Sequence, residues 1–311
     1  MKLFTSALLL LVICSNIVAQ TEEEPVTLET PTGNIEGTLW FPSSSGKIPV
    51  ALIIAGSGPT DRNGNNPMMT NNSLKMLAEG LAGKNIASVR YDKRGIAQSR
   101  DAGPEEANIR FDNFVDDAKA WVDLIDEDSR FSEIIIIGHS EGSLIGMIAS
   151  QKREVAKFIS LEGGGIPAGD LLREQLKNQP PMVLNPSLPI IEQLEKGEMV
   201  DSVPQMLYSL FRPSVQPYMI LWFKYNPQEE IAKLDKPILI VQGTTDIQTS
   251  ISDAEKLAKA NDNAEKLIVE GMNHILKDAE ADRQKNIQTY NNPDLPLKEG
   301  LIESLAEFIK E

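Results

Sequence analysis

The chain has 311 residues, of which 41% are hydrophobic and 24% charged, which is enough to bury a full core in one domain of about 250–300 residues. Its 30 Lys+Arg against 45 Asp+Glu give a formal net charge of −15. An acidic surface repels phosphate backbones, so we expect no nucleic-acid partner. The 21 glycines and 19 prolines are at ordinary levels, which excludes collagen-like and disordered chains.

The first 19 residues differ in character from the rest of the chain. Lys2 precedes an unbroken apolar run at 7–13, and Ala19 precedes an acidic stretch. The run is shorter than the roughly 20 residues of a membrane-spanning helix, so we expect no stable membrane span. The pattern is typical of a secretory signal, and we predict a signal peptide at 1–19. A buried N-terminal helix and a lipid anchor on Cys14 stay open as alternatives.

Cleavage after Ala19 would leave a mature chain over 20–311 that is exported, either to the periplasm or out of the cell. It would also remove Cys14, the only cysteine. Such a chain forms no disulfide, has no cysteine nucleophile and builds no cysteine-ligated zinc site. We expect neither a metal nor a cofactor, and a fold that depends on its core.

Polar and apolar residues alternate on both sides of a turn at 31–34, which predicts an antiparallel hairpin over 26–40. Short apolar runs ending in turn residues then follow, at 49–55, 85–90, 134–137, 158–161, 237–241 and 266–269. Continuous runs rich in β-branched residues suit the strands of a parallel sheet that is covered on both faces.

Helical stretches alternate with these runs, at 74–82 and 111–125 among others. A capping box of Ser252 and Glu255 predicts the start of another helix. A last helix has an apolar stripe made of Leu301, Ile302, Leu305, Phe308 and Ile309. The alternation predicts an α/β fold with a mostly parallel, doubly wound sheet.

The segment from about 166 to 230 has helical patches broken by prolines and no strand-like run. Ligands of such sheets bind beyond the carboxyl ends of the strands, and an insertion that leaves from there forms a lid. We therefore expect a helical cap. Among its aromatic residues, Trp222 and Phe223 are predicted to contact substrate; packing of the cap onto the domain is the open alternative.

The run at 134–137 leads into Gly-His-Ser-Glu-Gly at 138–142, and a helical stretch follows. Gly-x-Ser-x-Gly between a strand and a helix is typical of the sharp turn that exposes a nucleophilic serine. Ser140 is the predicted nucleophile. The backbone N–H of Glu141 lies at the helix N-terminus, where negative charge is favoured, so we predict that it is one oxyanion donor.

A serine nucleophile requires a base, and the chain has two histidines. His139 precedes Ser140 on the strand, and because side chains alternate along a strand it is expected to point away from Ser140. His274, after the last predicted strand, is therefore the predicted base. Asp246, after the preceding strand, is predicted to orient it. Glu162 is the rival acid, with strand termination as its alternative role.

The second oxyanion donor is predicted in the segment 56–64, which follows the first long apolar strand. The N–H of Ser57 is our choice, with a plain glycine-rich turn as the alternative. A phosphate-binding loop is disfavoured because no Gly-Lys-Ser/Thr follows and Asp61 would repel a phosphate.

Four features together resemble the α/β-hydrolases, in particular the serine aminopeptidase-like and esterase-like group. They are the segment 55–64, the segment 91–99 with its Asp-Lys-Arg-Gly at 92–95, the motif at 138–142, and the Asp246/His274 pair. The resemblance covers the mature chain. It implies an α/β-hydrolase fold and a structural role for the charges at 92–95. The family commonly has a glycine where Ala97 stands.

The resemblance also implies hydrolysis of esters, and in some relatives of amides or thioesters. We expect a secreted serine hydrolase that acts on small to medium carboxylic esters, with a small-molecule ester or amide as its partner. An aminopeptidase or acyl-thioesterase would use the same residues. The non-enzymatic alternative is a hydrolase-like binding protein, which would be expected to lack one of these residues.

Overall fold

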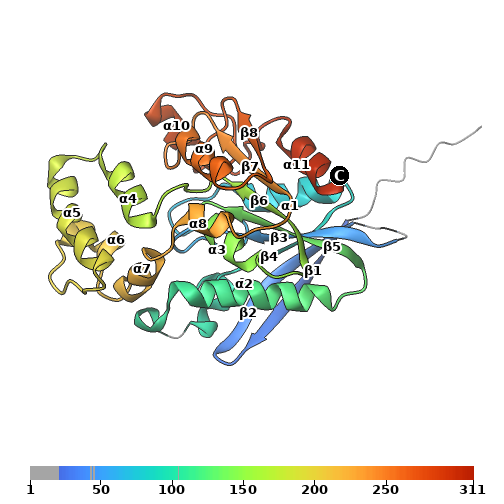
Figure 1. Ribbon diagram of the computed structural model, residues 1–311, viewed down its shortest axis with the longest axis horizontal. Coiled ribbons are helices and arrows are strands. Elements are labelled where there is room, and N and C mark those ends of the chain that lie inside the picture. The colour runs from blue at the N-terminus through green and yellow to red at the C-terminus, as the bar shows by residue number, and fades with distance from the viewer. Residues whose placement is uncertain (1–20, 43, 45, 104) are drawn as a thin grey trace, which may run out of the picture.

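The computed structural model describes residues 21–311 except 43, 45 and 104, so the predicted signal peptide and Cys14 lie outside the described residues. Figure 1 shows a twisted sheet with helices on both faces. Its strands are β1 (Thr21–Thr30), β2 (Gly33–Pro42), β3 (Ile48–Ile54), β4 (Ala87–Tyr91), β5 (Phe131–His139), β6 (Val155–Leu161), β7 (Ile238–Gly243) and β8 (Ala264–Val269).

The strands lie in the order β1-β2-β4-β3-β5-β6-β7-β8. β1 and β2 form the antiparallel hairpin, β2 pairs antiparallel with β4, and all later neighbours are parallel. The predicted hairpin, the predicted apolar strands and the mostly parallel doubly wound sheet are therefore confirmed. The carboxyl ends of β3, β5, β6 and β7 lie along one edge, which is where the predicted site residues follow.

The helices are α1 (Ser73–Gly83), α2 (Phe111–Asp126), α3 (Glu141–Ala149), α4 (Ala168–Leu176), α5 (Pro181–Glu195), α6 (Tyr208–Phe211), α7 (Gln216–Trp222), α8 (Pro227–Ile231), α9 (Ile251–Ala260), α10 (Arg283–Thr289) and α11 (Leu301–Lys310). Short 3₁₀ turns lie at Ala97–Ala102, Glu106–Asn108 and Gln205–Leu207. Among the described residues, no helix is both long and apolar enough to cross a bilayer.

The sheet separates two apolar cores because successive side chains of a strand point to opposite faces. In β5, Ile134 and Ile136 join a core with residues of α2, α3 and α9. Ile135 and Ile137 join a core with residues of α1 and α11 on the other face. Burial on both faces explains why these strands are continuous apolar runs.

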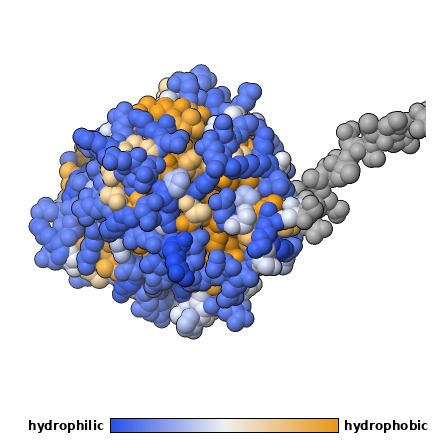
Figure 2. All heavy atoms as spheres, turned by 45° about the vertical axis from the view of Figure 1, so that its right-hand side comes forward, coloured by the Kyte–Doolittle hydropathy of each residue, from blue (hydrophilic) through white to orange (hydrophobic). Residues whose placement is uncertain are grey.

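The segment between β6 and β7 is helical, and α4 to α7 lie to one side of the sheet (Figure 1). It has a small apolar core of its own, in which Ile191, Leu194 and Phe211 are fully buried. Its last helix, α8, instead contributes Ile231 to the core around α2 and α3. The face shown in Figure 2 is largely hydrophilic, with apolar residues visible between the polar ones.

The predicted capping box of α9 is wrong in position. The helix is capped by Ser250, whose N–H and hydroxyl both donate to Asp253, at 2.9 and 2.7 Å. Ser250 and Asp253 have the same three-residue spacing as Ser252 and Glu255, but they lie one half-turn earlier. Asp253 also accepts from the N–H of Gly165 at 3.0 Å, so this register ties the start of the cap to α9.

Candidate active site

Ser140 stands between β5 and α3 with φ 56° and ψ −120°, a conformation that a residue with a side chain rarely adopts. The neighbouring glycines permit the turn. A Cβ on Gly142 would collide with the carbonyl oxygen of Ile54, and one on Gly138 would collide with that of Gly142. The sharp strand–turn–helix predicted from the motif is therefore present, with Ser140 half-buried.

The loop after β3 lies directly against this turn. A Cβ on Gly56 would be 3.0 Å from the Cβ of Ser140, so the absence of a side chain allows the two segments to meet. Ser57 follows and is exposed. Glu141 begins α3, and the first N–H groups of a helix have no carbonyl partner within the helix. The structure thus brings the loop that contains Ser57 and the start of α3 next to Ser140.

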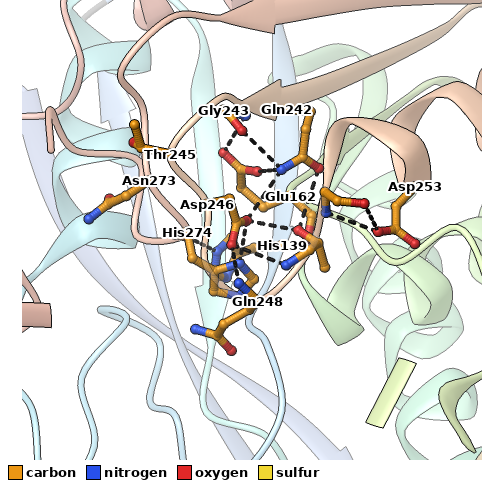
Figure 3. A network of polar contacts seen from close by, with 12 residues as sticks. His139, Glu162, Gln242, Gly243, Thr245, Asp246, Gln248, Asp253, Asn273 and His274 are labelled. Carbon is orange, nitrogen blue, oxygen red and sulfur yellow. Dashed lines mark hydrogen bonds and ion pairs between the residues drawn. The ribbon is translucent and has the colours of Figure 1, made fainter. Parts of the chain in front are cut away.

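His274 and Asp246 form a buried pair. Nδ1 of His274 donates to Oδ2 of Asp246 at 2.7 Å, and their side chains are 5% and 0% exposed (Figure 3). Burial alone would raise the pKa of Asp246, but the charge and hydrogen bond of His274 outweigh it and lower that pKa below its usual value. An ionised carboxylate can only accept hydrogen bonds, so this bond places a proton on Nδ1 of His274.

His139 contacts His274 directly, which alternation along the strand does not predict. Its Nε2 donates to the carbonyl oxygen of His274 at 2.7 Å, and the two rings lie 4.9 Å apart. Burial, reinforced by the neighbouring His274, lowers the pKa of His139 to about 4, so it is neutral. His139 therefore supports the loop of His274 and links it to the residue next to Ser140.

Glu162 does more than end its strand. It is fully buried, has φ 49°, and its Oε1 accepts from the N–H of Gly243 at 2.9 Å. Gln242 donates to the carboxyl groups of both Glu162 and Asp246. Burial, together with the charge of Asp246, raises the pKa of Glu162 well above its usual value, which favours its protonated form. Glu162 lies beside Asp246 because the two residues follow the neighbouring parallel strands β6 and β7.

The charges of the Asp-Lys-Arg-Gly segment each bind a different part of the chain. Asp92 accepts from the backbone and side chain of Arg62, at 2.8 and 2.7 Å, which anchors the loop after β3. Arg94 binds Asp117 of α2 at 2.5 Å. Ala97 has φ 43°, the left-handed region that favours the glycine common in relatives.

Trp222 and Phe223 both make packing contacts within the cap, and Trp222 also packs on α2. Trp222 stacks on Phe111 of α2 with ring centroids 6.5 Å apart, and it also lies 6.0 Å from Tyr218. Phe223 is 8% exposed within the apolar core of the cap. These contacts join the cap helices to one another and to α2, and contact with substrate stays a prediction. Among residues 21–311 as described, no group of three or more His, Cys, Asp or Glu is arranged to hold a metal.

Two family profiles match parts of the chain. The profile described as "Serine aminopeptidase, S33" matches residues 70–162, which include Ser140. The profile described as "TAP-like protein" matches residues 223–292, which include Asp246 and His274. The chain is 24% identical over 262 residues to the esterase EstD of Thermotoga maritima. That alignment covers 82% of this chain and 60% of EstD.

Solved structures share the fold at low sequence identity. Est1E of Butyrivibrio proteoclasticus, solved with ferulic acid bound, superposes with a TM-score of 0.63 at 18% identity, covering 92% of this chain and 100% of that one. An esterase of Pyrococcus furiosus superposes with a TM-score of 0.57 at 15% identity, covering 93% of this chain and 90% of its own. Likeness at this level establishes the fold.

Proposed function

Because the chain belongs to the α/β-hydrolase superfamily, we propose that it is a serine hydrolase that cleaves small to medium carboxylic esters through an acyl-enzyme intermediate. The observations that carry the proposal are the buried His274–Asp246 pair and the strained turn of Ser140, which are linked by the hydrogen bond from His139, the residue before Ser140, to the carbonyl oxygen of His274. The esterase activities named for similar proteins are consistent with it.

The proposed reaction follows from which atoms donate and which accept. Since Nδ1 of His274 donates to Asp246, Nε2 accepts the hydroxyl proton as Oγ of Ser140 attacks the ester carbonyl carbon. The N–H groups of Ser57 and Glu141 stabilise the oxyanion. The intermediate collapses, and the alcohol leaves with the proton from His274. Water, deprotonated by the same nitrogen, then releases the acid and restores Ser140.

A fluorophosphonate probe tests the nucleophile directly. The wild type is expected to be labelled at Ser140, and Ser140→Ala is expected to be unlabelled and inactive on p-nitrophenyl esters. Ser143→Ala is the matched control, because Ser143 lies on the same helix but its hydroxyl bonds Ser160 at 2.7 Å within the core. Labelling that persists in Ser140→Ala, or a folded wild type that takes no label, would contradict the proposal.

Substrate class is tested by comparing p-nitrophenyl esters of several acyl lengths with aminoacyl-p-nitroanilides and acyl thioesters. We expect the highest kcat/KM on short and medium esters. A preference of more than tenfold for the anilides would assign an aminopeptidase instead, with the same residues in the same roles.

We also propose that the chain is exported after cleavage of residues 1–19. The motivating observation is the sequence of Lys2, an apolar run and Ala19-Gln20. N-terminal sequencing of protein from its native host is expected to begin near Gln20. An intact Met1 in the cytosolic fraction would contradict export, and a lipid on Cys14 would support the anchored form.

A further inference from the structure

Lys93 is a lysine buried beneath the proposed catalytic serine. It lies two residues beyond the end of β4 and is 2% exposed. Its Nζ donates to the carbonyl oxygen of Gly56 at 2.5 Å and to Oε2 of Glu141 at 3.3 Å. The same nitrogen lies 5.2 Å from the ring centroid of Phe114. A buried ammonium is costly unless it is paired, so these contacts hold it at one point.

The bond to Gly56 controls the direction of a proposed oxyanion donor. The carbonyl of Gly56 and the N–H of Ser57 belong to one peptide group, and the described residues contain no cis peptide bond. A trans peptide is planar with its C=O and N–H pointing in opposite directions. A hydrogen bond that fixes the carbonyl therefore also fixes the N–H, on the side of the peptide away from Lys93.

This peptide needs such an anchor because its surroundings are pliable. Ser57 is exposed and lies between Gly56 and Gly58, and Gly58 has φ +70°. Glycines have the widest backbone freedom of all residues, so the segment by itself specifies its peptide orientation weakly. Close packing of Gly56 on Ser140 limits where the peptide lies, but leaves its rotation to the hydrogen bond on its carbonyl.

The bond to Glu141 reaches the second donor. Glu141 follows Ser140 directly, and its side chain is 2% exposed, with Oε1 lacking any hydrogen-bond partner among the described residues. Burial raises the pKa of Glu141, and the charge of Lys93 opposes that rise. The ammonium is therefore the partner that the Glu141 carboxyl has in this site.

We propose that Lys93 is a positioning residue of the oxyanion site, whose ammonium holds the peptide of Ser57 and the first residue of α3 in fixed relation around Ser140. This inference rests on the proposed serine-hydrolase function. The positive charge on the carbonyl of Gly56 also polarises that peptide and strengthens its N–H as a donor. The contribution is made to the oxyanion, so it lowers the barrier without improving binding of the ground-state ester.

The test compares Lys93→Met with Lys157→Met. Lys157 is also buried, donates to two backbone carbonyls at 2.9 Å and lies 5.6 Å from a phenylalanine ring, but its partners are in the last turn of α11. It reports the general effect of losing a buried ammonium. The double variant Lys93→Met/Glu141→Gln keeps both donor N–H groups and leaves no unpaired charge, so it carries the test if Lys93→Met does not fold.

For the Lys93 variants we expect kcat on a p-nitrophenyl ester to fall about 10- to 100-fold with KM nearly unchanged, since removal of a whole oxyanion donor costs roughly 10²–10³-fold. Affinity for a trifluoromethyl ketone, which binds as a tetrahedral oxyanion, should fall by the same factor. Lys157→Met should keep the wild-type kcat. If the fluorophosphonate probe labels the wild type and the wild type hydrolyses the ester, the proposed serine-hydrolase function holds whatever the variants show.

Two outcomes would overturn the inference while leaving the proposed function intact. One is a folded Lys93 variant whose kcat stays within threefold of wild type. The other is a fall in kcat that the trifluoromethyl ketone affinity does not follow, which would mean that Lys93 acts on general packing. Circular dichroism and denaturant unfolding of each variant confirm that the comparison is between folded proteins.

Discussion

Replacement of Asp246 by asparagine is predicted to disable the base by reversing its hydrogen bond. Oδ1 of Asp246 accepts from the N–H groups of Gln248 and Thr249, at 2.6 and 3.1 Å. Oδ2 accepts from His274 at 2.7 Å and from the hydroxyl of Thr249 at 2.8 Å. In Asp246→Asn the two backbone donors select the amide oxygen for the Oδ1 position. The NH₂ group must then face His274.

An NH₂ group in that position can only donate to Nδ1 of His274, so the proton of the neutral ring moves to Nε2. That nitrogen is then unable to take the proton of Ser140. The corresponding substitution in the serine-protease triad lowers turnover roughly 10⁴-fold. This corresponds to about 5–6 kcal/mol of barrier at 1.36 kcal/mol per tenfold. The carboxamide has nearly the size of the carboxylate, so we expect the fold to persist.

Turnover of one p-nitrophenyl ester by three variants decides the assignment. Asp253→Asn is the matched control, because Asp253 is a buried aspartate of the same region that caps α9 and contacts neither histidine. It should stay within a few-fold of wild type. Glu162→Gln should cost at most about tenfold, because a protonated Glu162 and a glutamine both carry a donor and an acceptor. If Glu162→Gln is inactive and Asp246→Asn is active, Glu162 is the triad acid and our reasoning is wrong.

Two further predictions concern stability. The low pKa of His139, about 4 against an ordinary 6.5, means that the unfolded chain binds a proton first as the pH falls, so stability should decline between pH 6.5 and 4. At pH 5 the loss in unfolding free energy from this group amounts to about 2 kcal/mol. Denaturant titrations at several pH values should show this loss in the wild type and not in His139→Gln. Parallel curves of unfolding free energy against pH for the two proteins would refute the prediction. Phe223→Ala should cost about 3 kcal/mol of unfolding free energy without changing acyl-chain preference. The control Tyr208→Ala, at a 44% exposed site of the cap, should cost less than about 0.5 kcal/mol of unfolding free energy. A shifted acyl-chain preference in Phe223→Ala would favour the substrate-contact interpretation.

The sequence by itself was sufficient for the fold class and for the elements that follow from local pattern. Each apolar run at 134–137 or 237–241 predicts a strand because burial on both faces leaves no polar position in it. Ser140 was recognisable because a sharp strand–helix turn requires glycines at 138 and 142, whose roles are steric and local. His274 and Asp246 were recognisable by their positions after strands, since the carboxyl ends of parallel strands share one edge.

Tertiary structure decided what depends on contacts between segments far apart in the chain. Alternation along β5 predicts the direction of His139 relative to Ser140, but not that its ring donates a hydrogen bond to the carbonyl oxygen of His274 in the loop after β8. Glu162 and Asp246 are separated by the whole cap in sequence, and only the pairing of β6 with β7 makes them neighbours and lets the charge of Asp246 raise the pKa of Glu162.

The same reason explains the aromatic residues of the cap and the role of Lys93. Composition indicates that Trp222 and Phe223 will be buried, because removing apolar surface from water is favourable. The hydrophobic effect has no directional preference, so it does not determine which surface covers them. Whether the surface that covers them is substrate, α2 or the cap itself is a matter of how the helices pack. Likewise the resemblance implies a structural role for the charges at 92–95, but it does not say which groups Lys93 contacts. Burial of Lys93 between the loop after β3 and the start of α3 arises only when β3, β4 and β5 lie side by side in the sheet.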